Sequence, residues 1–313
     1  MARIRLFLTY PFDPTHRFET SWLVPPMTLF FIRALISLYI FTVLLFNIGY
    51  NCARPSLGGC DTSRDAFSYF TVLSYWGLGF YFLTSAFHTF MYARRGGGGG
   101  GGAAAPLNSW PRALQWLHSL FYSTVTVFPF LVIIVFWSLL SSPATLSTPY
   151  SAWSNISQHA LNAVFAAVEI VLPRTSPAPW DHLPVQLLLV ALYLALAYVT
   201  HATKGFYTYS FLDPGLQGSL VAAYVFGIAV GICILFAVVQ GLIWVRRWAT
   251  EEKLGWDGVF VQQRESKVAH QQQQEQGHAD IEADAASSRA GGVDGDKEGE
   301  HELTTIHTAA PTA

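Results

Sequence analysis

The chain has 313 residues, of which 52% are hydrophobic and only 12% are charged. An apolar fraction this high, gathered in long runs, excludes an ordinary soluble globular protein. The apolar runs indicate a lipid bilayer as the partner. The net charge of −2 says nothing further about partners, and nucleic acid is not expected to bind.

Six long apolar runs precede Trp248, and each approaches or exceeds the roughly 20 residues that cross the hydrocarbon core of a bilayer. Because lipid-exposed backbone must satisfy its own hydrogen bonds, these runs are expected to be helices. The predicted fold is all-α, a polytopic six-transmembrane-helix bundle over 23–248, with N-terminal segment 1–22 and a polar, disordered tail over 249–313. The predicted spans are 23–49, 66–92, 112–140, 155–172, 184–203 and 218–245.

The positions of Lys and Arg predict the orientation, because basic residues collect on the cytosolic side of membrane helices. With six spans both termini share one side, which holds ten of these residues, against three on the other side. Both termini are therefore expected in the cytosol, with the protein in the endomembrane system, preferably the endoplasmic reticulum, or in the plasma membrane. The ten are Arg3, Arg5, Arg17, Arg94, Arg95, Arg112, Arg174, Arg246, Arg247 and Lys253, and the three are Arg54, Arg64 and Lys204.

Cys52 and Cys60 share the first loop, on the side where oxidising conditions permit a disulfide; two free thiols are the alternative. After the second span, the segment RRGGGGGGGAAAP, from Arg94, is predicted to be a flexible linker. Its glycines do not suit a phosphate-binding loop, because the lysine and the strand-to-helix context are missing.

Ionisable residues inside spans are costly and usually face the bundle interior. The fourth run carries His159, Asn162 and Glu169, which fall within about 80° of one another on an ideal helix and so form one inward stripe. Glu169 lies about 15 Å along the helix from His159, too far to orient the imidazole. We expect Glu169 to pair with Arg33, the only other charge within a span, with Arg174 as a competing partner.

Depth in the membrane brings together polar groups from different spans. Thr71 in the second span, His159 in the fourth and His201 in the fifth are all expected near the non-cytosolic face, with Tyr75 one turn deeper than Thr71. A second layer, near the cytosol, holds His88 and His118, and two histidines at one depth could ligate a haem.

Two chemistries fit these layers. A threonine hydroxyl could attack an ester carbonyl while a histidine accepts its proton. Alternatively, histidine pairs could ligate haem irons in a transmembrane electron carrier, His159 with His201 and His88 with His118. A third interpretation is a scaffold or transporter in which these side chains only hydrogen-bond neighbouring helices. Composition and spacing do not decide among the three.

Three segments resemble a known family, the androgen-induced membrane hydrolases. They are AWSNISQHALNAVFAAVEI around His159, FSYFTVLSYW around Thr71, and THATKGFYTYSFLDPG, which contains His201. The likeness extends over residues 67–215, and the shared order and spacing of the motifs make it more specific than any one motif.

The resemblance implies a six-span hydrolase of fatty acid esters of hydroxy fatty acids, with Thr71 as the nucleophile and His159 as the general base. His201, Asn162 and Tyr75 are candidate supporting residues. The implied substrate is an amphiphilic lipid ester, and no metal or organic cofactor is expected.

Overall fold

The computed structural model describes residues 12–94, 106–256, 272–278 and 280–282. The chain divides into two units, Met1–Gly258 and Val259–Ala313. In the described part of the second unit, 272–278 and 280–282 are helical; the other residues of this unit and residues 95–105 of the glycine linker lie outside the described residues.

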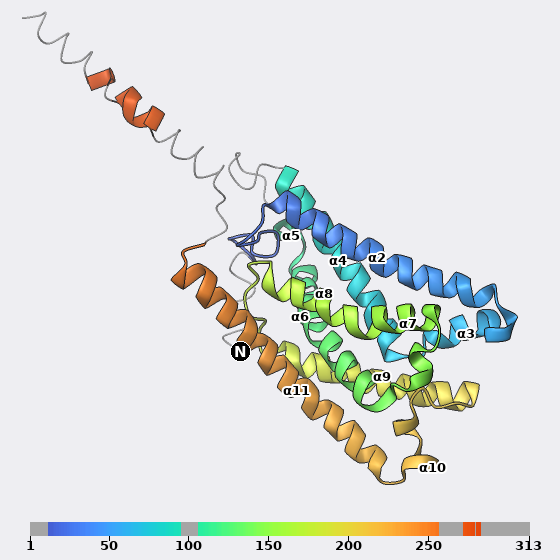
Figure 1. Cartoon of the computed structure of the whole chain (residues 1–313). Helices are drawn as coiled ribbons and strands as arrows, with labels where there is room; N and C mark the ends of the chain where they lie inside the picture. Colours follow the sequence, from blue (N-terminus) through green and yellow to red (C-terminus); the bar gives the residue numbers. More distant parts are fainter. Residues whose placement is uncertain (1–11, 95–105, 257–271, 279, 283–313) are drawn as a thin grey trace, which may run out of the picture. The chain divides into compact units, whose positions relative to one another are not determined.

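The first unit is built of helices, and its described residues contain no strand, only an isolated bridge between Ser21 and Pro173. The longer helices lie side by side (Figure 1). Their bounds are α2 (Pro26–Cys52), α3 (Gly59–Ala66), α4 (Phe70–Arg94), α5 (Pro106–Ser109), α6 (Arg112–Val135), α7 (Pro149–Ile156), α8 (Asn162–Val171), α9 (His182–Lys204), α10 (Pro214–Gln217) and α11 (Leu220–Arg247). Short 3-10 turns are η1 (Pro55–Leu57), η3 (Pro143–Leu146) and η5 (Ser210–Leu212), and π-helical turns are η2 (Phe136–Leu140), η4 (Ser157–Leu161) and η6 (Trp248–Lys253).

Four helical runs in the described part of the chain are long and apolar enough to cross a membrane: Pro26–Cys52, Arg112–Leu140, His182–Lys204 and Leu220–Lys253. The other two predicted spans are helical but less apolar. One is α4, and the other is the continuous run α7–η4–α8, which carries the polar residues of the fourth predicted span. A helix thus lies at each of the six predicted spans, and four of these helical runs are long and apolar enough to cross a membrane.

Helix ends follow the local sequence. α2 begins at Pro26, whose fixed φ suits a first turn and whose missing N–H is not needed there. At the start of α7, the Thr148 side chain accepts a hydrogen bond from the Ser151 amide. α9 stops at Gly205, which has φ +77° and donates its N–H to the His201 carbonyl, a conformation that favours glycine.

The core lies where α2 and α4 pack against α6, α8 and α11. α2 and α4 approach closely at Gly79, where a Cβ atom would lie 2.9 Å from the Ile40 side chain. The Ser37 hydroxyl uses this approach to donate to the Gly79 carbonyl at 3.0 Å. Facing outward, large apolar side chains such as Leu35 (64% exposed) and Phe226 (72% exposed) cover the surface, as expected of helices that face lipid.

One end of the bundle gathers the N-terminal segment, α5, the loop after α8 and the end of α11 (Figure 1). There the Asp13 amide donates to the Asn108 side chain at 3.2 Å, and the Arg174 amide donates to the Thr20 carbonyl at 2.9 Å. Arg17 forms two hydrogen bonds to Glu251, at 2.8 and 2.6 Å. Segments that the sequence assigns to the cytosolic side thus contact one another.

The opposite end gathers the first loop, α7 and the turn after α9. Lys204 pairs with Asp65 at 2.7 Å, and the Tyr150 ring stacks on Tyr50 with 3.7 Å between ring centroids. Cys52 and Cys60 are joined by a disulfide, as one of the two alternatives from the sequence proposed. This bond ties α3 to the end of α2.

Candidate functional site

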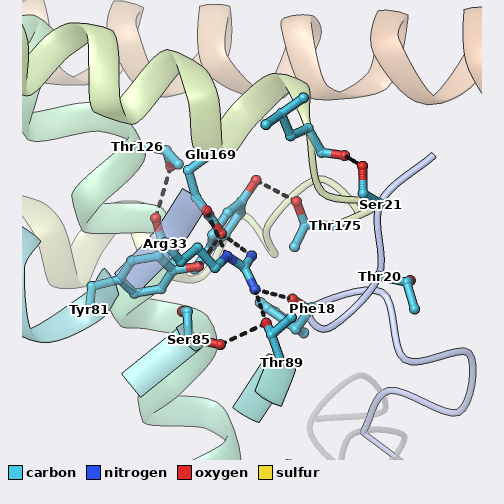
Figure 2. Close-up of polar contacts among 12 residues, drawn as sticks. Phe18, Thr20, Ser21, Arg33, Tyr81, Ser85, Thr89, Thr126, Glu169 and Thr175 are labelled. Carbon is cyan, nitrogen blue, oxygen red and sulfur yellow. Dashed lines mark hydrogen bonds and ion pairs between the residues drawn. The ribbon is translucent and has the colours of Figure 1, made fainter. Parts of the chain in front are cut away.

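The expected pair between Arg33 and Glu169 is present in the structure, buried so that each side chain is 1% exposed (Figure 2). Arg33 Nε donates to Glu169 Oε2 at 3.1 Å, and Arg33 Nη2 donates to Glu169 Oε1. Arg33 Nη1 donates to the Phe18 carbonyl at 2.8 Å and to Thr89 at 2.6 Å. Tyr81 completes the group by donating its hydroxyl to Glu169 at 2.8 Å.

These contacts join α2, α4, α8 and the N-terminal segment at one point. Because both charges are paired and hydrogen-bonded, the group is suited to holding the helices together. Arg174, the competing partner in the sequence, instead lies 3.8 Å from Glu251 at the end of the bundle.

Thr71 lies in the first turn of α4, where it lines an apolar cavity of about 310 Å³. Helices α6, α9 and α11 and the turn before α10 contribute the other walls. Three lining side chains carry hydroxyls, those of Thr71, Tyr193 and Tyr209, and the rest are hydrocarbon. The apolar lining residues are Phe70, Leu131, Val132, Val135, Phe136, Leu140, Leu187, Val190, Ala191, Leu194, Phe211, Leu212, Val225, Ile228 and Ala229.

The hydroxyls gather at the N-terminus of α4. The Phe70 amide donates to the Tyr209 hydroxyl at 3.1 Å, and the Tyr193 hydroxyl donates to the Ser68 carbonyl at 3.0 Å. Tyr209 also interacts with the side chains of Tyr193 and Thr71. The cavity thus has one polar region, beside Thr71, in an otherwise apolar lining.

His159 lies in the π-helical turn η4, and its ring is held on two sides. Its Nδ1 lies 3.0 Å from the Asn155 carbonyl, so Nδ1 carries the proton and Nε2 is left as an acceptor. One face of the imidazole stacks on Phe136, with 3.5 Å between centroids and 15° between planes. The neighbouring Trp137 indole N–H donates to the His159 carbonyl at 3.2 Å, which ties η2 to η4.

The predicted direct contact between Thr71 and His159 is absent from the hydrogen bonds of the described residues. Phe136 lines the cavity with Thr71 and at the same time covers His159, which is not among the lining residues. Phe136 thus borders the cavity and also stacks on the His159 imidazole. The expectation that Thr71 and His159 meet at one level therefore stays a prediction.

The fourth predicted span is not a regular α-helix, so its polar residues do not form the single inward stripe expected of an ideal helix. A π-helical turn holds one more residue than an α-helical turn and shifts the direction of the side chains that precede it. His159, within this turn, is half-buried against α6, while Asn162 (2% exposed) and Glu169 lie in the core.

The candidate supporting residues do not line the cavity at which the three hydroxyls meet. The His201 ring stacks on Tyr207 at 3.7 Å between centroids, at the end of α9. Tyr75 is buried (1% exposed), and neither its hydroxyl nor Asn162 Oδ1 has a hydrogen-bond partner among the described residues. Neither His201, Asn162 nor Tyr75 lines the cavity beside Thr71.

His88 and His118 are adjacent, as their common depth predicted, with ring centroids 5.6 Å apart. Trp110 contacts the His88 ring at 4.5 Å, and Tyr81 stacks on His118 at 5.8 Å. His159 and His201 stack on different aromatic rings, Phe136 and Tyr207. No group of three or more His, Cys, Asp or Glu side chains in the described part of the chain is arranged to hold a metal ion.

Phe136, Tyr193 and Tyr209 were not singled out from the sequence as site residues. Tyr209 stands in the aromatic segment GFYTYSF after His201, but nothing in the sequence shows which of its rings faces a cavity. Searches against protein-family models, curated proteins and solved structures find no match to this chain.

Proposed function

We propose that this chain is an integral membrane hydrolase that cleaves lipid esters, fatty acid esters of hydroxy fatty acids or similar amphiphiles. The observation that carries the proposal is the cavity beside Thr71, which is hydrocarbon throughout except where three hydroxyls meet. Pockets for small amphiphiles typically combine an apolar lining with a few placed polar groups. An acyl chain suits the apolar walls, and an ester group suits the region beside Thr71.

The proposed topology has six spans with both termini in the cytosol. Its support is the alternation of contacts between the two ends of the bundle. The N-terminal segment contacts α5, the loop after α8 and the end of α11, whereas the first loop contacts α7 and the end of α9. Crossing the bilayer six times in alternate directions produces this grouping.

In the proposed reaction, His159 Nε2 accepts the proton of the Thr71 hydroxyl while Oγ1 attacks the ester carbonyl. The tetrahedral intermediate expels the alcohol, which takes the proton from His159 and leaves the acyl group on Thr71. A water molecule then gives a proton to His159 and attacks the acyl carbonyl, which releases the acid and returns the proton to Thr71. The hydrogen bond from Nδ1 to Asn155 supports this role, because it leaves Nε2 free to accept.

We expect the reaction to need a movement of Phe136, since this ring stacks on His159 and borders the cavity that His159 does not line. A rotation of this side chain out of the stack would open a path between the imidazole and Thr71. Movements of this kind complete many catalytic sites only when substrate is bound.

A fluorophosphonate probe applied to the purified full chain tests the proposal. Wild type is expected to be labelled, Thr71→Ala is not, and Thr84→Ala on the same helix serves as the matched control that keeps labelling. Labelling that survives Thr71→Ala would refute the nucleophile. A Soret band in the purified protein, lost on changing a histidine, would favour the electron carrier instead.

A further inference from the structure

The hydroxyls in the polar region of the cavity can bind a ligand oxygen by redirecting one of their hydrogen bonds. A tyrosine hydroxyl has one proton to donate and can also accept hydrogen bonds. The Tyr209 oxygen accepts from the Phe70 amide, while the Tyr193 proton goes to the Ser68 carbonyl. The Tyr209 proton is therefore available to the oxygen of Tyr193 or to a ligand oxygen beside Thr71.

This region suits an uncharged group. None of the lining side chains carries a formal charge. Burial raises the pKa of Tyr209, which keeps its hydroxyl protonated as a donor. A carboxylate placed here would lose its hydration without gaining a cation, so its burial is costly, whereas a ketone or ester carbonyl needs one donated hydrogen bond.

The size of the cavity limits the hydrocarbon that it takes. A methylene group is similar in size to a water molecule, whose share of liquid volume is about 30 Å³. A volume of about 310 Å³ therefore covers about ten methylene groups of one chain.

We propose that the cavity binds a single hydrocarbon chain of about ten carbons and that Tyr209 donates its hydroxyl proton to an uncharged carbonyl oxygen at the end of that chain. Applied to the ester hydrolase, this inference rests on the proposed function and makes Tyr209 the residue that positions the carbonyl for Thr71. The binding itself involves no turnover and is measured separately.

The test uses the full chain in lipid nanodiscs and dissociation constants from displacement of a fluorescent alkyl ketone. The competitors are methyl ketones from hexyl to hexadecyl, the matched alkanes, and decanoate. Wild type should bind the decyl ketone most tightly, and more tightly than either the alkane or the carboxylate. Tyr209→Phe should weaken ketone binding about fivefold, the effect of one neutral hydrogen bond, and leave the alkane unchanged. Tyr207→Phe is the matched control, because Tyr207 stands in the same turn but stacks on His201 outside the cavity.

A second variant, Val132→Phe, fills part of the apolar lining and should move the preferred chain to a shorter length. A flat dependence on chain length, tight binding of decanoate, or ketone binding that is indifferent to Tyr209→Phe would overturn the inference. If Tyr209→Phe does not fold, the ketone, alkane and carboxylate series on wild type still decides it. Ketone binding without labelling of Thr71 would refute the hydrolase and leave the inference standing; labelling without ketone selectivity would do the reverse.

Discussion

Replacing Glu169 with glutamine should destabilise the folded protein, because it leaves a buried charge without a partner. The substitution keeps the shape of the side chain but leaves the Arg33 guanidinium without its counter-charge, and both groups are 1% exposed. Removing one partner of a buried ion pair costs about 3–5 kcal/mol. The upper part of this range is expected, because both carboxylate oxygens accept from Arg33, and the NH2 of a glutamine would face one of these donors.

The free energy of unfolding is measured by denaturant titration of the full chain in detergent micelles. The double variant Arg33→Met, Glu169→Leu removes both charges and should recover much of the loss, since two apolar side chains leave no unpaired charge. Glu252→Gln is the exposed control, with no measurable change expected. A loss below about 1 kcal/mol for Glu169→Gln, or a double variant no more stable than the single one, would refute the reasoning.

Three further outcomes are expected. Cys52→Ser should lower the free energy of unfolding by about 2.5 kcal/mol, the loop-entropy value for a bond between residues eight apart; equal denaturant midpoints in oxidising buffer would contradict it. Burial raises the pKa of Glu19 from 4.5 to about 8. The folded state therefore holds this proton more tightly, and the stability it contributes is full below pH 4.5 and lost as the pH rises through about 8. The melting temperature of the wild type should therefore fall as the pH rises through this range, and Glu19→Gln should fall less. A variant whose melting temperature follows the wild-type pH profile would argue against this assignment. In a His159→Cys background, adding Phe136→Ala should speed alkylation of the new thiol by an apolar maleimide several-fold compared with His159→Cys alone. An unchanged rate would mean that Phe136 does not cover this position.

The helices and the main ion pair could be predicted from the sequence because each depends on a strong and simple cost. In lipid, an apolar run must satisfy its own backbone hydrogen bonds and so forms a helix. The expected span 112–140 accordingly coincides with the observed helical run Arg112–Leu140. A charge within a span needs a partner, and Arg33 and Glu169 were the two candidates within spans.

The arrangement of the candidate site could not be predicted in the same way. An ideal helical repeat gives the direction of His159 only if every turn is regular, and η4 is not. The stack of His159 on Phe136 depends on packing between helices that are distant in sequence, and so does the cluster of hydroxyls around Tyr209. Depth along a helix groups segments at one level, but depth alone says nothing about the direction in which a side chain points.

The ion pair between α2 and α8 also has a consequence for biosynthesis. Arg33 and Glu169 are 136 residues apart, so at about 5–20 residues per second the arginine waits roughly 7 to 27 s for its acceptor to be made. During that time the first hydrophobic helix carries an uncompensated cation, which opposes insertion by about 3 kcal/mol. Until α8 is made, the apolar residues of α2, at about −0.3 to −0.6 kcal/mol each, must offset this cost alone.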